Sequence, residues 1–77
     1  MNDSILRIAG TPIFVKDLPS GDLKIWHPYN EGVRQIVEPI CRGRGRWHPG
    51  YNNWVVFAAV KHLVLADLLR AVGGRHG

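Results

Sequence analysis

The first third of the chain carries hydrophobic residues at alternate positions, most clearly from residue 13 onward. A period of two is typical of strands that bury one face, and turn-forming residues separate the runs. The pattern predicts strands at 5–9, 13–16 and 23–27, with the first two joined as a hairpin. The face expected to point inward holds Leu6, Ile8, Ile13, Val15, Leu23 and Ile25. The opposite face holds Arg7, Phe14, Lys16, Lys24 and Trp26. A slip of one residue would exchange the two faces.

Two later segments follow the period of a helix instead. An apolar stripe is formed by Val33, Ile36, Val37 and Ile40 after a candidate N-cap at Asn30. Pro39 cannot donate a hydrogen bond to the carbonyl of Gln35, so this helix is expected to end or kink there. A second helix is predicted from about residue 58 to residue 72, with its leucines gathered on one side. Two glycines then stop it, and residues 73–77 are expected to fray.

Residues 42–57, between the two helices, predict an antiparallel hairpin that pairs 44–48 with 53–57. Pro49 suits the second position of a type II turn, and Gly50 would supply the positive φ that the next position needs. Trp54 opens the return strand, and we expect it to be buried against both helices. The chain order is then β-β-β-α-β-β-α. This order predicts an α+β fold, an antiparallel sheet of about five strands with two helices packed on one face.

Length and composition bound the molecule further. The 77 residues fit one small domain, 1–77, and 45% hydrophobic with 21% charged residues is ordinary for a folded chain. A single cysteine, Cys41, excludes an internal disulfide, fits a reducing compartment and resembles a small buried hydrophobe. The sequence contains neither an apolar run of about 20 residues nor a signal peptide. A cytoplasmic protein of bacterial or phage type, with no membrane partner, is therefore expected.

The charge favours a polyanionic partner. The formal net charge is +4, and the region between Glu38 and Asp67 contains no acidic residue. Arg42, Arg44 and Arg46 lie at alternate positions there. We expect them to share one side of a strand, where they can bind phosphates bidentately or can keep a solvated edge strand from pairing.

Aromatic residues complete this interpretation. Trp26 and Phe14 share their predicted face with basic residues, and such a surface suits stacked bases and phosphates of single-stranded nucleic acid. The alternative is a second small core beneath the hairpin. Trp47 fits either the core or a base-stacking platform. His48 and Tyr51 flank the turn and are candidates for contact with a groove or backbone, although the turn alone also explains them.

The hairpin also carries the pattern Arg46-Trp47-His48-Pro49, followed by Trp54-Val55-Val56 on the return strand. This pattern resembles the small HARP (HepA-related protein) domain of annealing helicases. The resemblance implies a strand, helix, hairpin, helix arrangement and binding to branched or single-stranded DNA. It implies no ATPase chemistry, which belongs to a separate motor domain. His48 replaces the aspartate that this pattern usually carries.

The residues of an enzyme site are missing from the sequence. His27, His48, His62 and His76 fall in unrelated elements without metal-ligand spacing. No carboxylate cluster, phosphate-binding loop or nucleophile elbow is present. We therefore expect no catalysis, no cofactor, no metal and no small-molecule substrate. The sequence predicts a DNA-binding module without sequence specificity; the alternative is a protein-interaction or homodimeric assembly domain.

Overall fold

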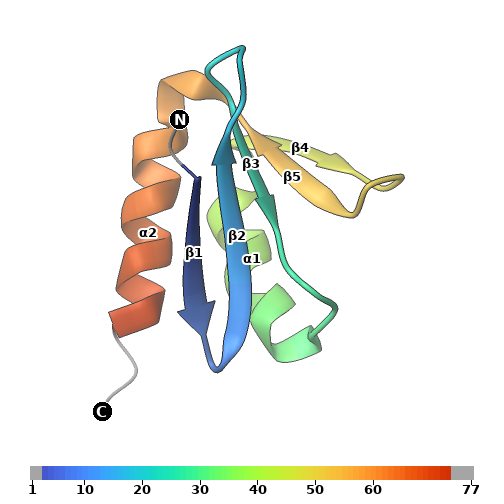
Figure 1. The fold of residues 1–77 in the computed structure, drawn as a ribbon, viewed down its shortest axis with the longest axis vertical. Helices are drawn as coiled ribbons and strands as arrows, with labels where there is room; N and C mark the ends of the chain where they lie inside the picture. The colour runs from blue at the N-terminus through green and yellow to red at the C-terminus, as the bar shows by residue number, and fades with distance from the viewer. Residues whose placement is uncertain (1–2, 74–77) are drawn as a thin grey trace.

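The computed structural model describes residues 3–73, which form one five-stranded antiparallel sheet and two α-helices (Figure 1). The elements are β1 (Asp3–Ile8), β2 (Thr11–Asp17), β3 (Leu23–Trp26), α1 (Glu31–Cys41), β4 (Gly45–His48), β5 (Asn53–Val56), the 3₁₀ turn η1 (Ala58–Val60) and α2 (Lys61–Gly73). The strands lie in the order β1-β2-β3-β5-β4, so β5 separates β3 from β4. The predicted α+β class and chain order are confirmed. Gly73 belongs to α2, and the rest of the predicted tail lies outside the described residues.

Both helices pack on one face of the sheet; α1 lies behind it in Figure 1, and α2 runs beside β1. The strands contribute Ile8, Ile13, Val15, Leu23, Ile25 and Val56 to the core, each at most 4% exposed. The helices contribute Val33, Val37, Cys41, Val64 and Leu68. The predicted register is therefore confirmed, because its inward residues are the buried ones, with Leu6 packed at their margin. Neither helix of residues 3–73 covers the opposite face, which we call the open face.

The β1–β2 connection is tighter than the sequence pattern predicted. Ile8 pairs with Thr11, which leaves Ala9 and Gly10 as a two-residue turn, with φ of 52° and 81°. Two successive positive φ angles are typical of a type I′ turn, whose twist matches that of the flanking strands. Ala9 therefore belongs to the turn and not to the strand.

The β4–β5 hairpin is confirmed, but its turn differs from the prediction. The Tyr51 N–H donates to the His48 carbonyl at 3.2 Å, which places Pro49 and Gly50 at the centre of a β-turn. Gly50 does not have a positive φ; Asn52 does, at 52°. The predicted type II turn is therefore wrong, and the positive φ lies at Asn52, because asparagine tolerates this region better than most residues.

Helix α1 begins where the sequence indicated. The Asn30 side chain accepts a hydrogen bond from the Val33 N–H at 3.1 Å and donates to Thr11 Oγ1 at 3.1 Å, which ties the helix start to β2. The helix continues two residues past Pro39 and ends at Cys41. Ile36, expected in the buried stripe, is 38% exposed, and Cys41 is buried instead.

Trp54, which was expected to be buried against both helices, is only partly buried. It packs against the core beside Ile25, its partner across the β3–β5 ladder. Its ring meets that of Trp47 edge to face, with centroids 5.5 Å apart. Trp47 itself is 48% exposed on the helix side of the edge strand β4.

Candidate nucleic-acid interface

Two rows of side chains cross the open face of the sheet. Residues directly opposite each other in antiparallel strands point to the same side, so the strand register determines each row. The aromatic row runs through Ile5, Phe14, Trp26, Asn53 and His48. The basic row runs through Asp3, Lys16, Lys24, Val55 and Arg46. The rows are two residues apart along every strand.

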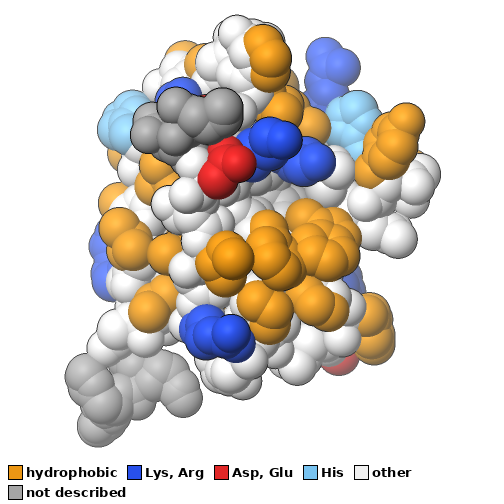
Figure 2. Space-filling model, in the orientation of Figure 1, with side chains coloured by type: hydrophobic (Ala, Val, Ile, Leu, Met, Phe, Trp, Pro, Cys, Tyr) orange, Lys and Arg blue, Asp and Glu red, His pale blue; other side chains and the backbone are white. Residues whose placement is uncertain are grey.

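The centre of the aromatic row is a pair of rings. The centroids of Phe14 and Trp26 are 4.8 Å apart and their planes are tilted by 34°. Trp26 is 37% exposed, and Ile5 at the row's β1 end is 61% exposed. Figure 2 looks onto this face and shows hydrophobic side chains gathered over the middle strands, with Lys and Arg side chains above and below them. Flat apolar surface is therefore available between positive charges.

The surface around these rings is hollowed, with a volume of about 580 Å³. Residues of both rows line the hollow, and Tyr51 reaches it from the turn of the hairpin. Tyr51 is 76% exposed, so its ring is not fixed by packing. The hollow is thus bordered by aromatic rings from the sheet and from the hairpin turn.

The basic residues divide into two groups by position. Among residues 3–73, those that form ion pairs are Arg34, Arg42, Arg44, Lys61 and Arg70. The basic residues of the same part of the chain that form no ion pair are Arg7, Lys16, Lys24 and Arg46. All of the second group point to the open face, where Asp3 is the only acidic residue in the two rows. The open face therefore carries most of the unneutralised positive charge of the described residues.

Arg42 and Arg44 do not share a strand with Arg46, which corrects the sequence-based expectation. Arg42 caps α1, and Arg44 lies in the turn that follows, because β4 begins only at Gly45. Arg44 donates to Asp67 Oδ2 at 2.8 Å, and this hydrogen bond lowers the pKa of Asp67. Only Arg46 of the three arginines lies on the open face.

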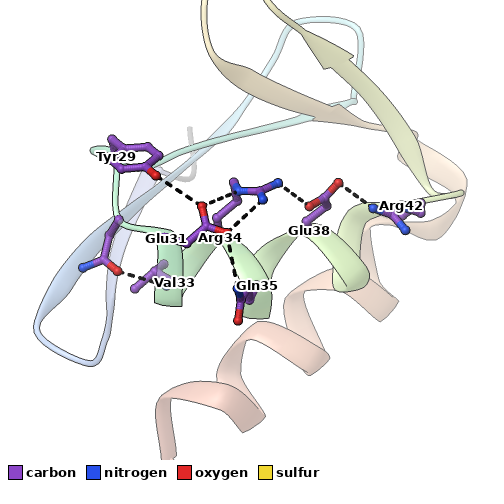
Figure 3. Close-up of polar contacts among 8 residues, drawn as sticks. Tyr29, Glu31, Val33, Arg34, Gln35, Glu38 and Arg42 are labelled. Atoms are coloured by element: carbon purple, nitrogen blue, oxygen red, sulfur yellow. Dashed lines mark hydrogen bonds and ion pairs between the residues drawn. The ribbon is translucent and has the colours of Figure 1, made fainter.

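Figure 3 shows that Arg42 ends a chain of contacts along α1. Arg34 donates to Glu31 at 3.0 and 2.9 Å and to Glu38 at 2.7 Å, and Arg42 pairs with the other oxygen of Glu38. The hydrogen bonds from Arg34, with help from Gln35, lower the pKa of Glu31 to about 2. These charges are engaged with each other on the helix side.

The open face brings most of the predicted site residues together. Those on it are Arg7, Phe14, Lys16, Lys24, Trp26, Arg46 and His48, with Tyr51 at its border. The sequence-based set missed Ile5, Asn53 and Val55. Ile5 has the same parity as Arg7 along β1, so the alternation already indicated its side. Asn53 and Val55 were missed because no face had been assigned to the return strand.

A second hollow of about 620 Å³ lies on the helix side, between the hairpin and α1. Trp47 and Trp54 line it, with Arg34 and Glu38 from α1 opposite. Its charged residues already form an ion pair with each other. This arrangement gives the groove less unneutralised charge than the open face.

The described residues contain little else that could support chemistry. No group of three or more His, Cys, Asp or Glu side chains could hold a metal ion within 3–73. Burial raises the pKa of Cys41 to about 12, so its nucleophilic thiolate is scarce at neutral pH. In the same part of the chain, neither helix combines the length and apolar character that crossing a bilayer requires.

Comparisons of the chain with protein-family models, with curated proteins and with solved structures gave no match.

Proposed function

We propose that the protein binds single-stranded nucleic acid, without sequence specificity, on the open face of its sheet. The observation that carries the proposal is the Phe14–Trp26 pair, with Phe14 half-buried and Trp26 exposed, between basic side chains that form no ion pair within residues 3–73. Bases of any identity can stack on such rings, and each phosphate contact releases a counterion. We assign the phosphate contacts to cations of the open face, chiefly those of the basic row, and not to Arg42 or Arg44, which are paired with acids.

DNA is the form of nucleic acid that we favour, because the RW-x-P hairpin resembles that of HARP domains. The DNA binding that this resemblance implies remains a prediction. A cytoplasmic location, which would give access to single-stranded DNA, is part of the same proposal.

A fluorescence titration with a single-stranded oligonucleotide at low salt tests the proposal. We expect quenching in the wild type, and an affinity lower by ~1–3 kcal/mol for Trp26→Ala, because one base loses its stacking partner. Trp47→Ala is the matched control, since Trp47 is exposed on the helix side. No binding at low salt, or equal losses in the two variants, would contradict the proposal.

A second candidate function is assembly with another protein or a second copy of the chain. Helix α2 supports it, because Leu63, Leu69 and Val72 are 44%, 56% and 38% exposed. Exposed apolar groups on one helix favour association. Sedimentation at increasing concentration would show a dimer that Leu69→Gln weakens, whereas a concentration-independent monomer would exclude self-association.

A further inference from the structure

The arrangement of the two rows indicates the path that a bound nucleic-acid strand takes across the sheet. This inference rests on the proposed function. The rows run perpendicular to the β-strands and are about 6.6–6.8 Å apart, the rise of two strand residues. One row offers rings and the other offers cations. A nucleic-acid strand likewise has bases on one side and phosphates on the other.

The cations are distributed unequally on the two sides of the aromatic row. On one side, the basic row places Lys16, Lys24 and Arg46 on β2, β3 and β4, a span of about 14 Å from three strand spacings. Asp3 ends this row at β1. On the other side lies Arg7, whose guanidinium donates to the Gly10 carbonyl at 3.3 Å and is thereby directed to the β1–β2 turn.

Asn53 adds a polar group within the aromatic row. Its side chain is 7% exposed and lines the open-face hollow, and its Oδ1 is buried without a hydrogen-bond partner among residues 3–73. A buried acceptor without a partner is unfavourable and rare in folded proteins. The β3–β5 ladder ends at Ile25 and Trp54, and the next residue on each strand is Trp26 and Asn53, so the two lie opposite each other at its end. A half-turn about χ2 exchanges the oxygen and nitrogen of the amide, so either end can face the hollow.

We propose that the strand crosses the sheet perpendicular to the β-strands, with its bases on the aromatic row and its phosphates on the basic row. The base on Trp26 then hydrogen-bonds to the amide of Asn53. A sheet of this width accommodates about two or three bases. Asparagine is a common partner of adenine, whose N6 donates and whose N7 accepts a hydrogen bond, so whichever end of the amide faces the hollow finds a partner on that base. The site therefore prefers adenine at this one position within otherwise non-specific binding.

Salt titrations of matched charge variants test the path. Arg46→Gln and Arg7→Gln each remove one arginine that forms no ion pair within residues 3–73 from the same face. We expect Arg46→Gln to reduce the slope of log affinity against log salt by about 0.7, the value for one phosphate contact with a single strand. Arg7→Gln should leave the slope unchanged. Equal reductions in both variants would overturn the path while leaving nucleic-acid binding itself intact.

Short oligonucleotides of dA and dT test the contact with Asn53. We expect wild-type protein to bind dA about tenfold more tightly, and Asn53→Ala to remove this preference with little change for dT. Gln35→Ala, which removes an exposed amide on α1, is the control and should keep the preference. If Asn53→Ala unfolds by circular dichroism, Asn53→Thr replaces it, because threonine suits a strand. A preference that survives the loss of the amide would overturn this contact, whereas absence of all binding would overturn the proposed function.

Discussion

At the scale of single residues, the backbone angle of Ala9 stands out. Its φ of 52° lies in the left-handed region, where a Cβ atom approaches the following carbonyl oxygen. This conformation costs roughly 1–2 kcal/mol for residues other than glycine. The turn between β1 and β2 retains it because the strands on either side determine its geometry.

Replacement of Ala9 by glycine should therefore stabilise the protein. We expect a gain of about 0.5–1 kcal/mol, because the relieved strain exceeds the additional entropy of glycine in the unfolded chain. Urea unfolding would measure the change. Gly10→Ala, at φ 81°, should shift the midpoint in the opposite direction. A less stable Ala9→Gly protein would contradict the strain argument.

The turn of the second hairpin shows why single residues were harder to predict than strands. Gly50 and Asn52 both belong to residue types that tolerate positive φ, and both lie between the same two strands. In the structure, Asn52 adopts the positive φ and Gly50 does not. Which of the two adopts the angle depends on how the His48–Asn53 pair closes the loop, and that pairing is not encoded by either residue alone.

At the scale of elements, α1 stabilises itself through its charges. Glu31, Arg34, Glu38 and Arg42 are spaced three or four residues apart, the spacing at which helical side chains meet. Arg42 follows this helical spacing, and this is why the sequence pattern wrongly grouped it with Arg44 and Arg46 on a strand. A period of two indicates a shared side only within a strand, and Arg42 still belongs to the end of α1.

The lowered pKa of Glu31 gives this helix a defined response to acid. A carboxylate whose folded-state pKa is about 2, against an ordinary value of 4.5, contributes stability above pH 4.5, and this is lost as pH falls through 2. Glu31→Gln should therefore lower the Tm at pH 7. The difference from wild type should shrink below about pH 4.5 and vanish near pH 2.

Thermal melts across this pH range would measure the effect. Arg34→Gln should reproduce the profile, because the hydrogen bonds from Arg34 are the main cause of the shift. A difference between Glu31→Gln and wild type that persists unchanged at pH 2 would show that the glutamate acts by something other than its charge.

At the scale of the whole molecule, the sequence predicted the sheet and its open face because alternation is a local property. Within β2 and β3, alternation along the strand already determines which face each side chain points to. Trp26 and Lys24 were therefore assigned to the correct face. The pairing of β3 with β5 is not local, since α1 separates them in the chain. Neither the basic row nor the position of Asn53 could be recognised before that pairing was known.

The ladder between β3 and β5 is also the seam between two locally folded pieces. Residues 3–26 form a meander and 45–56 a hairpin, and only three residue pairs, from Leu23↔Val56 to Ile25↔Trp54, join them in the sheet. Closing this seam requires the loop that contains α1 to be fixed, so it costs more entropy than either hairpin turn. Opening of the seam is therefore a natural route of partial unfolding.

Both rows of the open face cross this seam. A strand of nucleic acid bound along them would contact both pieces at once, and would therefore favour the closed sheet by mass action. Native-state hydrogen exchange measures this directly. We expect an oligonucleotide to slow exchange at the β3–β5 amides that pair Ile25 with Trp54, and to leave the turn at Gly10 unaffected. Closing of the sheet and binding would then be coupled, because the bound strand holds together the two pieces that form its own site.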